Sequence, residues 1–282
     1  MRITALWVAH IIVQRGSLSS PHLARLLKKI LSQSYFGARE KIVRWRLYYL
    51  TRARGRVIIK KRQKVKGRAM KDNPSTNLKP VELLKPVFEQ STTVFEALKM
   101  RTTTRSFSPK KIPPQLLSDI LWAAQGVNRS NGPFEGLGRT AGSASNSQEI
   151  LIYVTREEGT YLYQPDSHKL TPIAAGDNRP LAIGPGQRKS GSDAPFRLIY
   201  VVDLDKFKTA GFPEPGLYDP DIQKSYYFVD TGLIAQNVYL AASTLGLASW
   251  FHNCNKVELT KVLKLTSQQR PLFGQTVGYP GD

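Results

Sequence analysis

Cysteine and histidine are scarce in this chain, with one Cys and four His among 282 residues. The single cysteine, Cys254, cannot form an intramolecular disulfide or a cysteine metal cluster, and the four histidines share no metal-ligand spacing. No apolar run reaches the ~18 residues that a transmembrane helix needs. These absences argue against a disulfide scaffold, a zinc site and a membrane-spanning protein, and we expect a protein of the reducing cytoplasm.

Acidic residues are almost missing from the first quarter of the chain. Residues 1–71 hold 19 Lys and Arg and a single acid, Glu40, whereas residues 72–282 hold 22 basic and 20 acidic residues. The formal net charge of +20 therefore belongs almost entirely to the N-terminal part. We expect a basic extension over residues 1–75 and a nearly neutral globular domain over residues 76–282, which has enough apolar residues for a core.

Three interpretations of the extension stay open. It is a basic arm that binds nucleic acid or anionic lipid, or an organelle-targeting leader, since it is rich in Arg and poor in acid. In the third interpretation it lies outside the working protein, because a start at Met70 gives a nearly neutral domain. Its aromatic residues form no repeating module for base stacking, and no nucleic-acid partner is expected for the globular domain.

Apolar periodicity and turn residues predict mixed helices and strands after residue 76. Hydroxyl residues before Val94 favour a helix start, paired prolines favour another, and glycine favours the ends of two helices. The segment 164–193 shows no clear period and is predicted to be irregular. The predicted helices are 94–99, 113–125, 226–245 and 257–265, and the predicted strands are 149–154, 160–163, 197–203, 248–251 and 275–280.

A cluster of cationic and hydroxyl side chains follows the first of these helices. Arg101 and Arg105 flank three consecutive threonines, Thr102–Thr104. Arginine offers a planar fork of donors, and threonine hydroxyls and backbone N–H groups supply further donors, so the cluster suits a phosphate monoester. A solvated basic turn is the alternative. The polar loop 128–147 is equally ambiguous, because it is suited to wrap a polar ligand or to form an ordinary surface loop.

Two glycine-rich stretches mimic nucleotide-binding motifs and are rejected. Gly136–Ala141 has the glycine spacing of a dinucleotide fingerprint, but no strand precedes it and no helix follows in a βαβ unit. Gly184–Ser190 is similar to a phosphate-binding loop, but Arg188 occupies the place where that loop requires glycine.

Six short motifs, taken in order, carry a more specific signal than any one of them alone. Together they resemble the FMN-dependent nitroreductase family, closest to the branch that includes peptide azoline dehydrogenases. The resemblance covers residues 85–282 and none of the extension. The motifs are Arg101–Phe107, Leu121–Gly126, Arg139–Gln148, Asp230–Gly232, Leu245–Leu247 and Val277–Pro280.

This resemblance implies an α+β fold in three layers, with a mostly antiparallel central sheet flanked by helices. It also implies a homodimer with two FMN molecules in clefts between the subunits, and NAD(P)H as the electron donor. In the family's pattern, hydride passes from the nicotinamide to the flavin, and then hydride or electrons pass to an oxidised small molecule. No catalytic side-chain acid or base is required, and the sequence contains no constellation that suggests one.

The resemblance also assigns cofactor-binding positions. The residues near Arg101 hold the FMN phosphate, and Arg105 faces the pyrimidine edge of the flavin. A second group contacts the flavin from the partner subunit, and a third lies at a strand end near the ring. The three groups are Arg101, Thr102, Thr103 and Arg105; Ser143, Ala144, Asn146 and Gln148; and Trp250, His252 and Asn253.

One departure from the family pattern bears on the phosphate site. Many relatives place basic residues after the last strand to grip the phosphate, and here only Gly281 and Asp282 follow the final motif. We expect Arg101, or a basic residue from another loop such as Lys189, to take that role.

Three functions are compatible with these features. The first is an FMN-dependent reductase of nitro or quinone-like acceptors that uses NAD(P)H. The second is a flavin-dependent dehydrogenase of a peptide heterocycle, an azoline, with oxygen as the acceptor. The third is a non-enzymatic binder in which the basic extension matters and the flavin site is vestigial. The first is the one we expect, with the second as the alternative.

Overall fold

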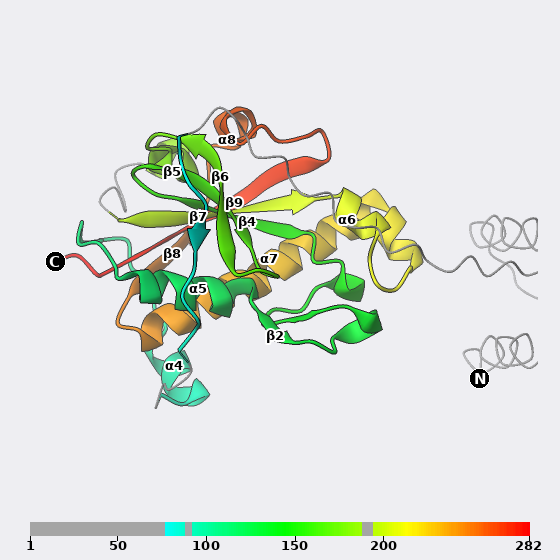
Figure 1. Ribbon diagram of the computed structural model, residues 1–282, viewed down its shortest axis with the longest axis horizontal. Coiled ribbons are helices and arrows are strands. Elements are labelled where there is room, and N and C mark those ends of the chain that lie inside the picture. Colours follow the sequence, from blue (N-terminus) through cyan, green and yellow to red (C-terminus); the bar gives the residue numbers. More distant parts are fainter. Residues whose placement is uncertain (1–76, 88–91, 188–193) are drawn as a thin grey trace, which may run out of the picture. The chain divides into compact units, whose positions relative to one another are not determined.

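The computed structural model describes residues 77–87, 92–187 and 194–282. Seven strands form one sheet in the order β1-β6-β5-β4-β7-β9-β8, and each neighbouring pair is antiparallel. Figure 1 shows the helices α5 and α7 across one face of this sheet and α8 on the other. The strands are β1 (Val81–Glu82), β4 (Ile150–Thr155), β5 (Gly159–Gln164), β6 (Lys169–Ala175), β7 (Phe196–Asp203), β8 (Ala248–His252) and β9 (Gln269–Gly278).

The central strand β7 shows why the molecule has three layers. Its apolar side chains alternate between two hydrophobic clusters, because successive residues of a strand point to opposite faces. Leu198 and Tyr200 pack in the cluster under α5 (Pro114–Gln125) and α7 (Pro220–Thr244). Ile199 packs in the cluster under α8 (Lys256–Val262). The expected α+β arrangement with a mostly antiparallel sheet is confirmed.

The first described helix, α4 (Val94–Met100), begins and ends where local chemistry dictates. The Thr93 hydroxyl accepts the Glu96 N–H, and the Glu96 carboxylate accepts the Thr93 N–H, which together form a capping box. Arg101 caps the other end, and its own N–H bonds the Ala97 carbonyl at 2.9 Å. The arginine and threonine cluster therefore begins at the residue that caps the end of this helix.

The long helix α7 begins six residues before its predicted start. The carboxylate of Asp219 accepts the N–H groups of Asp221 and Ile222, and Pro220 occupies the first turn. The left-handed residue Gly246 (φ 67°) follows its end, as expected.

The interpretation of residues 164–193 as irregular is wrong for part of that range. Strand β6 pairs with β5 along most of its length and joins β1 to the sheet. Pro172 interrupts its alternation, and a register shift accompanies it. Proline lacks an N–H and is atypical inside a strand, which is why the sequence pattern hid this one. Residues 188–193 lie outside the described range, and Lys189 with them.

Several smaller elements have no counterpart among the sequence predictions. A two-stranded ribbon and two short turns of 3-10 helix shape the polar loop, and a one-turn helix follows β7. They are β2 (Val127–Arg129), β3 (Gly138–Arg139), η1 (Pro133–Glu135), η2 (Ala144–Asn146) and α6 (Asp205–Lys208).

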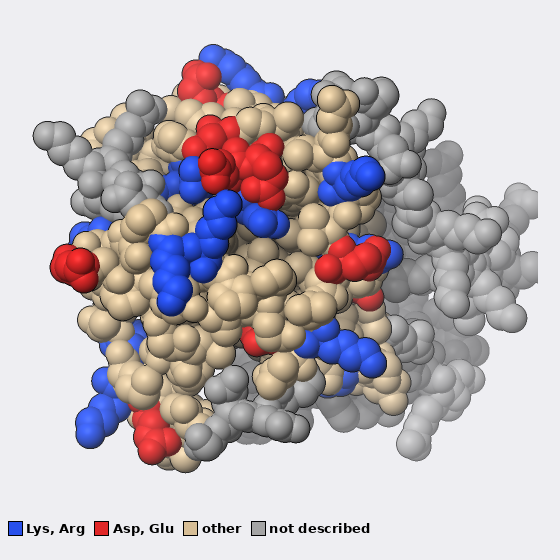
Figure 2. Space-filling view, turned by 60° about the vertical axis from the view of Figure 1, so that its left-hand side comes forward, with Lys and Arg blue, Asp and Glu red and all other residues tan. Residues whose placement is uncertain are grey.

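Charge on the described domain is mixed in sign. Figure 2 shows acidic and basic side chains interspersed on one face. None of the helices in the described ranges is long and apolar enough to cross a membrane. The boundary expected near residue 75 stays a prediction, since residues 1–76 lie outside the part of the chain that the structure describes.

Candidate functional site

The segment Arg101–Ser108 is laid along the ends of β8 and β9 by backbone hydrogen bonds. The Thr104 N–H donates to the Ser249 carbonyl at 3.1 Å, and the Ser108 N–H donates to the Tyr279 carbonyl at 3.0 Å. Phe107 forms an isolated bridge with Pro280 and is buried. These backbone contacts fix the segment at several points, so the cationic side chains project from an anchored backbone.

Both arginines of this segment lie over aromatic rings. The Arg101 guanidinium is 5.6 Å from the centre of the Tyr239 ring, and the Arg105 guanidinium is 5.9 Å from the centre of the Trp250 ring. These distances allow a cation–π attraction. Neither guanidinium forms an ion pair with any residue that the structure describes. Their donors are therefore available to an anionic ligand.

A single hydroxyl, that of Tyr239 on α7, joins the threonine cluster to the strand end. It accepts the Phe251 backbone N–H at 2.8 Å and lies 3.2 Å from the Thr103 hydroxyl oxygen. Thr102 is exposed beside it. The Tyr239 hydroxyl thus links the predicted phosphate residue Thr103 to the backbone of β8 at Phe251, between the predicted residues Trp250 and His252. Tyr239 was not predicted from the sequence, because nothing in a helical repeat marks one tyrosine as a bridge.

The side chains at the end of β8 are mostly engaged within the protein. Trp250 is buried, with its ring centre 4.4 Å from that of His252. The His252 ring bonds the Thr276 hydroxyl at 2.8 Å and the Asn253 carbonyl at 2.9 Å. Burial lowers the pKa of His252 to about 4, so the ring is neutral at physiological pH. It therefore makes a poor proton donor, and Asn253 is the exposed member of the group.

The only cysteine is a core residue. Cys254 is buried in the cluster under α8, and this burial raises the pKa of its thiol to about 11. Thiolate character is what makes a cysteine reactive. The geometry therefore favours a packing role over a redox role.

The loop with the predicted partner contacts has an unusual backbone. Ser145, Asn146 and Gln148 adopt φ values of 50°, 54° and 51°. This left-handed region is uncommon for residues other than glycine, and such residues cluster at functional sites. The Ser143 hydroxyl accepts the Gln148 N–H at 3.0 Å and helps to hold the turn.

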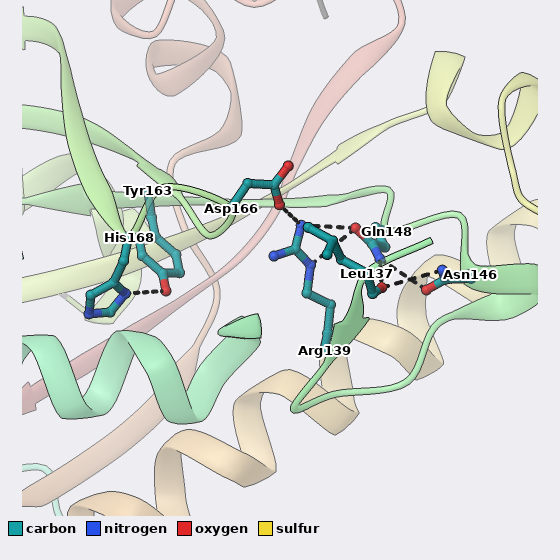
Figure 3. A network of polar contacts seen from close by, with 7 residues as sticks. All are labelled: Leu137, Arg139, Asn146, Gln148, Tyr163, Asp166 and His168. Atoms are coloured by element: carbon teal, nitrogen blue, oxygen red, sulfur yellow. Dashed lines mark hydrogen bonds and ion pairs between the residues drawn. The ribbon is translucent and has the colours of Figure 1, made fainter. Parts of the chain in front are cut away.

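Figure 3 shows how side chains brace this loop. The Gln148 amide donates to the Leu137 carbonyl at 2.8 Å and to the Asn146 side chain at 3.0 Å. Its oxygen accepts from the Arg139 guanidinium at 3.0 and 3.1 Å, and Arg139 also pairs with Asp166. Gln148 is thus committed to internal contacts, and its predicted cofactor role stays a prediction.

Two buried carboxyl groups lie behind the same loop. Asp230 on α7 accepts the Ala144 N–H at 2.9 Å, and Glu149 accepts the Ser147 hydroxyl at 2.6 Å. Burial first, and then the nearby Asp230 charge, raise the pKa of Glu149 to about 8, and burial also raises the pKa of Asp230. Glu149 therefore carries a proton at neutral pH. Asp230 anchors the loop, and the sequence flagged it only as part of a motif.

We predict that Glu149 makes folding stability fall between about pH 6.5 and 8.5. Its folded pKa of about 8 lies above the unfolded value of 4.5, so the folded state binds more protons in this window. The stability is lost as pH rises through 8. The pKa of His252 is shifted in the opposite direction, from 6.5 to about 4, so this group makes stability rise with pH. That rise ends near pH 6.5, which is why the window for Glu149 starts there.

Urea unfolding across that window should give a falling free energy for the wild type and a nearly flat profile for Glu149→Gln. The variant should be the more stable of the two at the alkaline end. Equal slopes in the two proteins would contradict a buried, protonated Glu149.

The two groups of predicted site residues, the polar loop and the arginine segment, contact helix α7 at different positions along its axis. Asp230 anchors the polar loop, and Tyr239 anchors the arginine segment nine residues later. That separation corresponds to about 13 Å along a helix axis. Among the described residues, no hydrogen bond or ring contact joins the two groups directly. Within one chain the loop and the arginines therefore form two half-sites.

The fold and the site together define a class of protein. A three-layer α+β domain presents unpaired guanidinium groups and hydroxyls at the edge of an aromatic-lined strand end, as expected for an enzyme that holds a phosphorylated aromatic cofactor. The nitroreductase family model matches residues 98–279. The chain belongs to the nitroreductase family, and it is an oxidoreductase of the FMN-dependent class.

Relatives of this chain agree with that assignment. "Putative nitroreductase MJ1384" of Methanocaldococcus jannaschii is 28% identical over 195 residues, which cover 65% of this chain and 89% of that protein. A crystal structure of a "putative nitroreductase" from Ralstonia eutropha JMP134 is 27% identical with a TM-score of 0.61, covering 72% of this chain and 90% of that one. A crystal structure of a "putative nitroreductase" from Anabaena variabilis shares the fold. It is 17% identical with a TM-score of 0.52, and the match covers 72% of this chain and 42% of that one.

Proposed function

We propose that this protein is a homodimeric FMN enzyme that transfers electrons from NAD(P)H to a nitro- or quinone-like small molecule. The observation that carries the proposal is the pair of guanidinium groups, Arg101 over the Tyr239 ring of α7 and Arg105 over the Trp250 ring of β8, neither with an ion-pair partner among the described residues. Family membership supplies the reaction class.

The donor chemistry of the segment fits FMN. A phosphate monoester needs several charge-assisted donors, and Arg101 and Thr103 would hold it, with Thr102 beside them. The Arg105 guanidinium would orient the pyrimidine edge, where a positive charge favours the electron-rich form of the ring. The planar Trp250 would help to exclude water from the same place.

A second copy of the chain is the natural source of the missing contacts. Helix α4 leaves two large apolar side chains open, with Phe95 84% and Val94 70% exposed. On helix α7, Val229 is 60% and Leu233 47% exposed. Large apolar side chains exposed on two neighbouring helices are typical of an interface. In a dimer across α4 and α7, the polar loop of one copy would reach the arginines of the other.

When bound, FMN would supply the hydride and electron chemistry, and the protein supplies position and field. Arg101 and Thr103 anchor, Arg105 orients, and the loop Ser143–Asn146 of the second copy closes the site. His252 holds no mobile proton, since both of its ring nitrogens are engaged. No side-chain acid or base is needed in this assignment.

The test is an anaerobic absorbance experiment on the purified full-length protein. We expect a yellow protein whose flavin absorbance bleaches on addition of NADH or NADPH and returns when a quinone or nitroaromatic is added. A yellow protein that ignores both nicotinamides would instead favour the azoline dehydrogenase alternative. A colourless protein that gains no flavin when FMN is added would overturn the proposal.

A further inference from the structure

A second cationic pocket lies behind the polar loop, away from the arginine segment. Its volume is about 90 Å³, room for several water-sized groups but not for a flavin ring system. It is lined by residues from α5, β3, β4, β5, the β5–β6 turn and α6, together with Gln148, which braces the polar loop. The polar members are Gln125, Arg139, Gln148, Tyr163, Gln164, Asp166 and Lys206.

Arg139 brings an unsatisfied donor to this pocket. Its side chain is only 8% exposed. Nε and Nη2 donate to Gln148, and Nη2 also pairs with Asp166, but Nη1 is buried with no hydrogen-bond partner among the described residues. In Figure 3 this nitrogen lies on the side of the guanidinium that faces Tyr163. Leaving a buried charged donor without a partner is costly, so a ligand that accepts from it would be favoured.

Lys206 of α6 adds a second cation to the same wall. No ion pair or hydrogen bond of its ammonium group is found within the described ranges. Burial lowers its pKa, and its surroundings include the charged groups of Asp203, Arg139 and Asp166 and the protonated carboxyl of Glu149. Of the acids, Asp203 already accepts from the Gln269 amide at 3.1 Å and from the Asp205 N–H at 3.1 Å.

The acidic side chains near the pocket do not neutralise its positive charge. Asp166 binds only one edge of Arg139 and is itself 68% exposed. Glu149 carries a proton at neutral pH because its pKa is raised to about 8. The residues that line the pocket therefore bear two positive charges, those of Arg139 and Lys206, against the single carboxylate of Asp166.

We infer that this pocket binds a small oxyanion, a phosphate or a carboxylate, between Arg139 Nη1 and the Lys206 ammonium. Gln125 is buried on the α5 side and supplies an amide to the same space. The site is separate from the proposed FMN phosphate site, since no residue is common to both. It also lies against the brace of the polar loop, because Gln148 lines the pocket and braces the loop.

Calorimetric titration of the full-length protein with inorganic phosphate, and separately with acetate, tests the inference at constant ionic strength. Lys206→Gln should weaken binding about tenfold or more, the loss expected for one charge-assisted hydrogen bond. Asp166→Asn should tighten it, because the carboxylate that competes for Arg139 is removed. Lys208→Gln, which alters an exposed lysine of the same helix, should leave binding unchanged.

Arg101→Ala is the control for ion binding at the flavin site, and in this variant the pocket should still bind the ion. Saturable binding of phosphate alone identifies a phosphate ligand, and binding of acetate alone a carboxylate; either supports the site. The inference is overturned if neither ion shows saturable binding. It is also overturned if binding vanishes in Arg101→Ala, or if Lys206→Gln and Asp166→Asn change the affinity in the same direction. Circular dichroism confirms that each variant is folded.

Discussion

Arg101→Ala should strip FMN from the purified protein. The guanidinium makes no ion pair with a described residue, so its removal takes donors from the ligand rather than from the fold. Losing charge-assisted hydrogen bonds worth about 1.5–3 kcal/mol weakens FMN binding roughly tenfold to a hundredfold. Flavin content after gel filtration and the quenching of flavin fluorescence during titration measure the effect.

Two further variants sharpen this result. Arg101→Lys keeps the charge but loses the planar fork, and its affinity should lie between those of the wild type and Arg101→Ala. Lys99→Ala changes an exposed lysine in the last turn of α4, two residues away, and should bind FMN normally. Wild-type flavin occupancy in Arg101→Ala would refute the phosphate role.

Leu233→Glu should convert the protein from a dimer to a monomer and lower its flavin content with it. Leu233 is 47% exposed on the open face of α7, so the substitution is tolerated by a single chain. In a dimer it would bury an unpaired carboxylate at a cost of several kcal/mol, which raises the dimer dissociation constant by at least about a hundredfold. Gel filtration with light scattering reports the mass.

Val257→Glu is the matched control for that experiment. Val257 is also apolar and 66% exposed, but it belongs to α8 on the opposite layer of the sheet. The mass and flavin content of this variant should match the wild type. A wild-type protein that is monomeric, or a Leu233→Glu variant that stays dimeric with bound FMN, would contradict the interface across α7.

Local signals in the sequence predicted a good part of this fold. The hydroxyl run before Val94 and the prolines before Leu116 mark two helix starts, and both helices form there. The apolar run of Arg197–Asp203 is the central strand β7. In each case the chemistry that decides the structure lies within a few residues, so a single stretch of sequence is enough to read it.

The remainder depends on partners far away in the chain. Strands β6 and β9 contain Pro172 and Pro271, which obscure the alternation of their neighbours, and pairing with adjacent strands holds both in the sheet. At the site, the arginine segment was recognisable from its composition. The link of this segment to β8 through Tyr239 was not recognisable, because the segment and the strand are more than a hundred residues apart.

The turn Ser145–Gln148, with three left-handed residues, has a consequence for the proposed dimer. A flexible loop would lose conformational freedom when a second subunit and a cofactor arrive, and that entropy would weaken both events. Here Asp230, Leu137 and Arg139 already fix the loop in the isolated chain. The ordering is completed when the polypeptide folds, so association can proceed between preorganised surfaces.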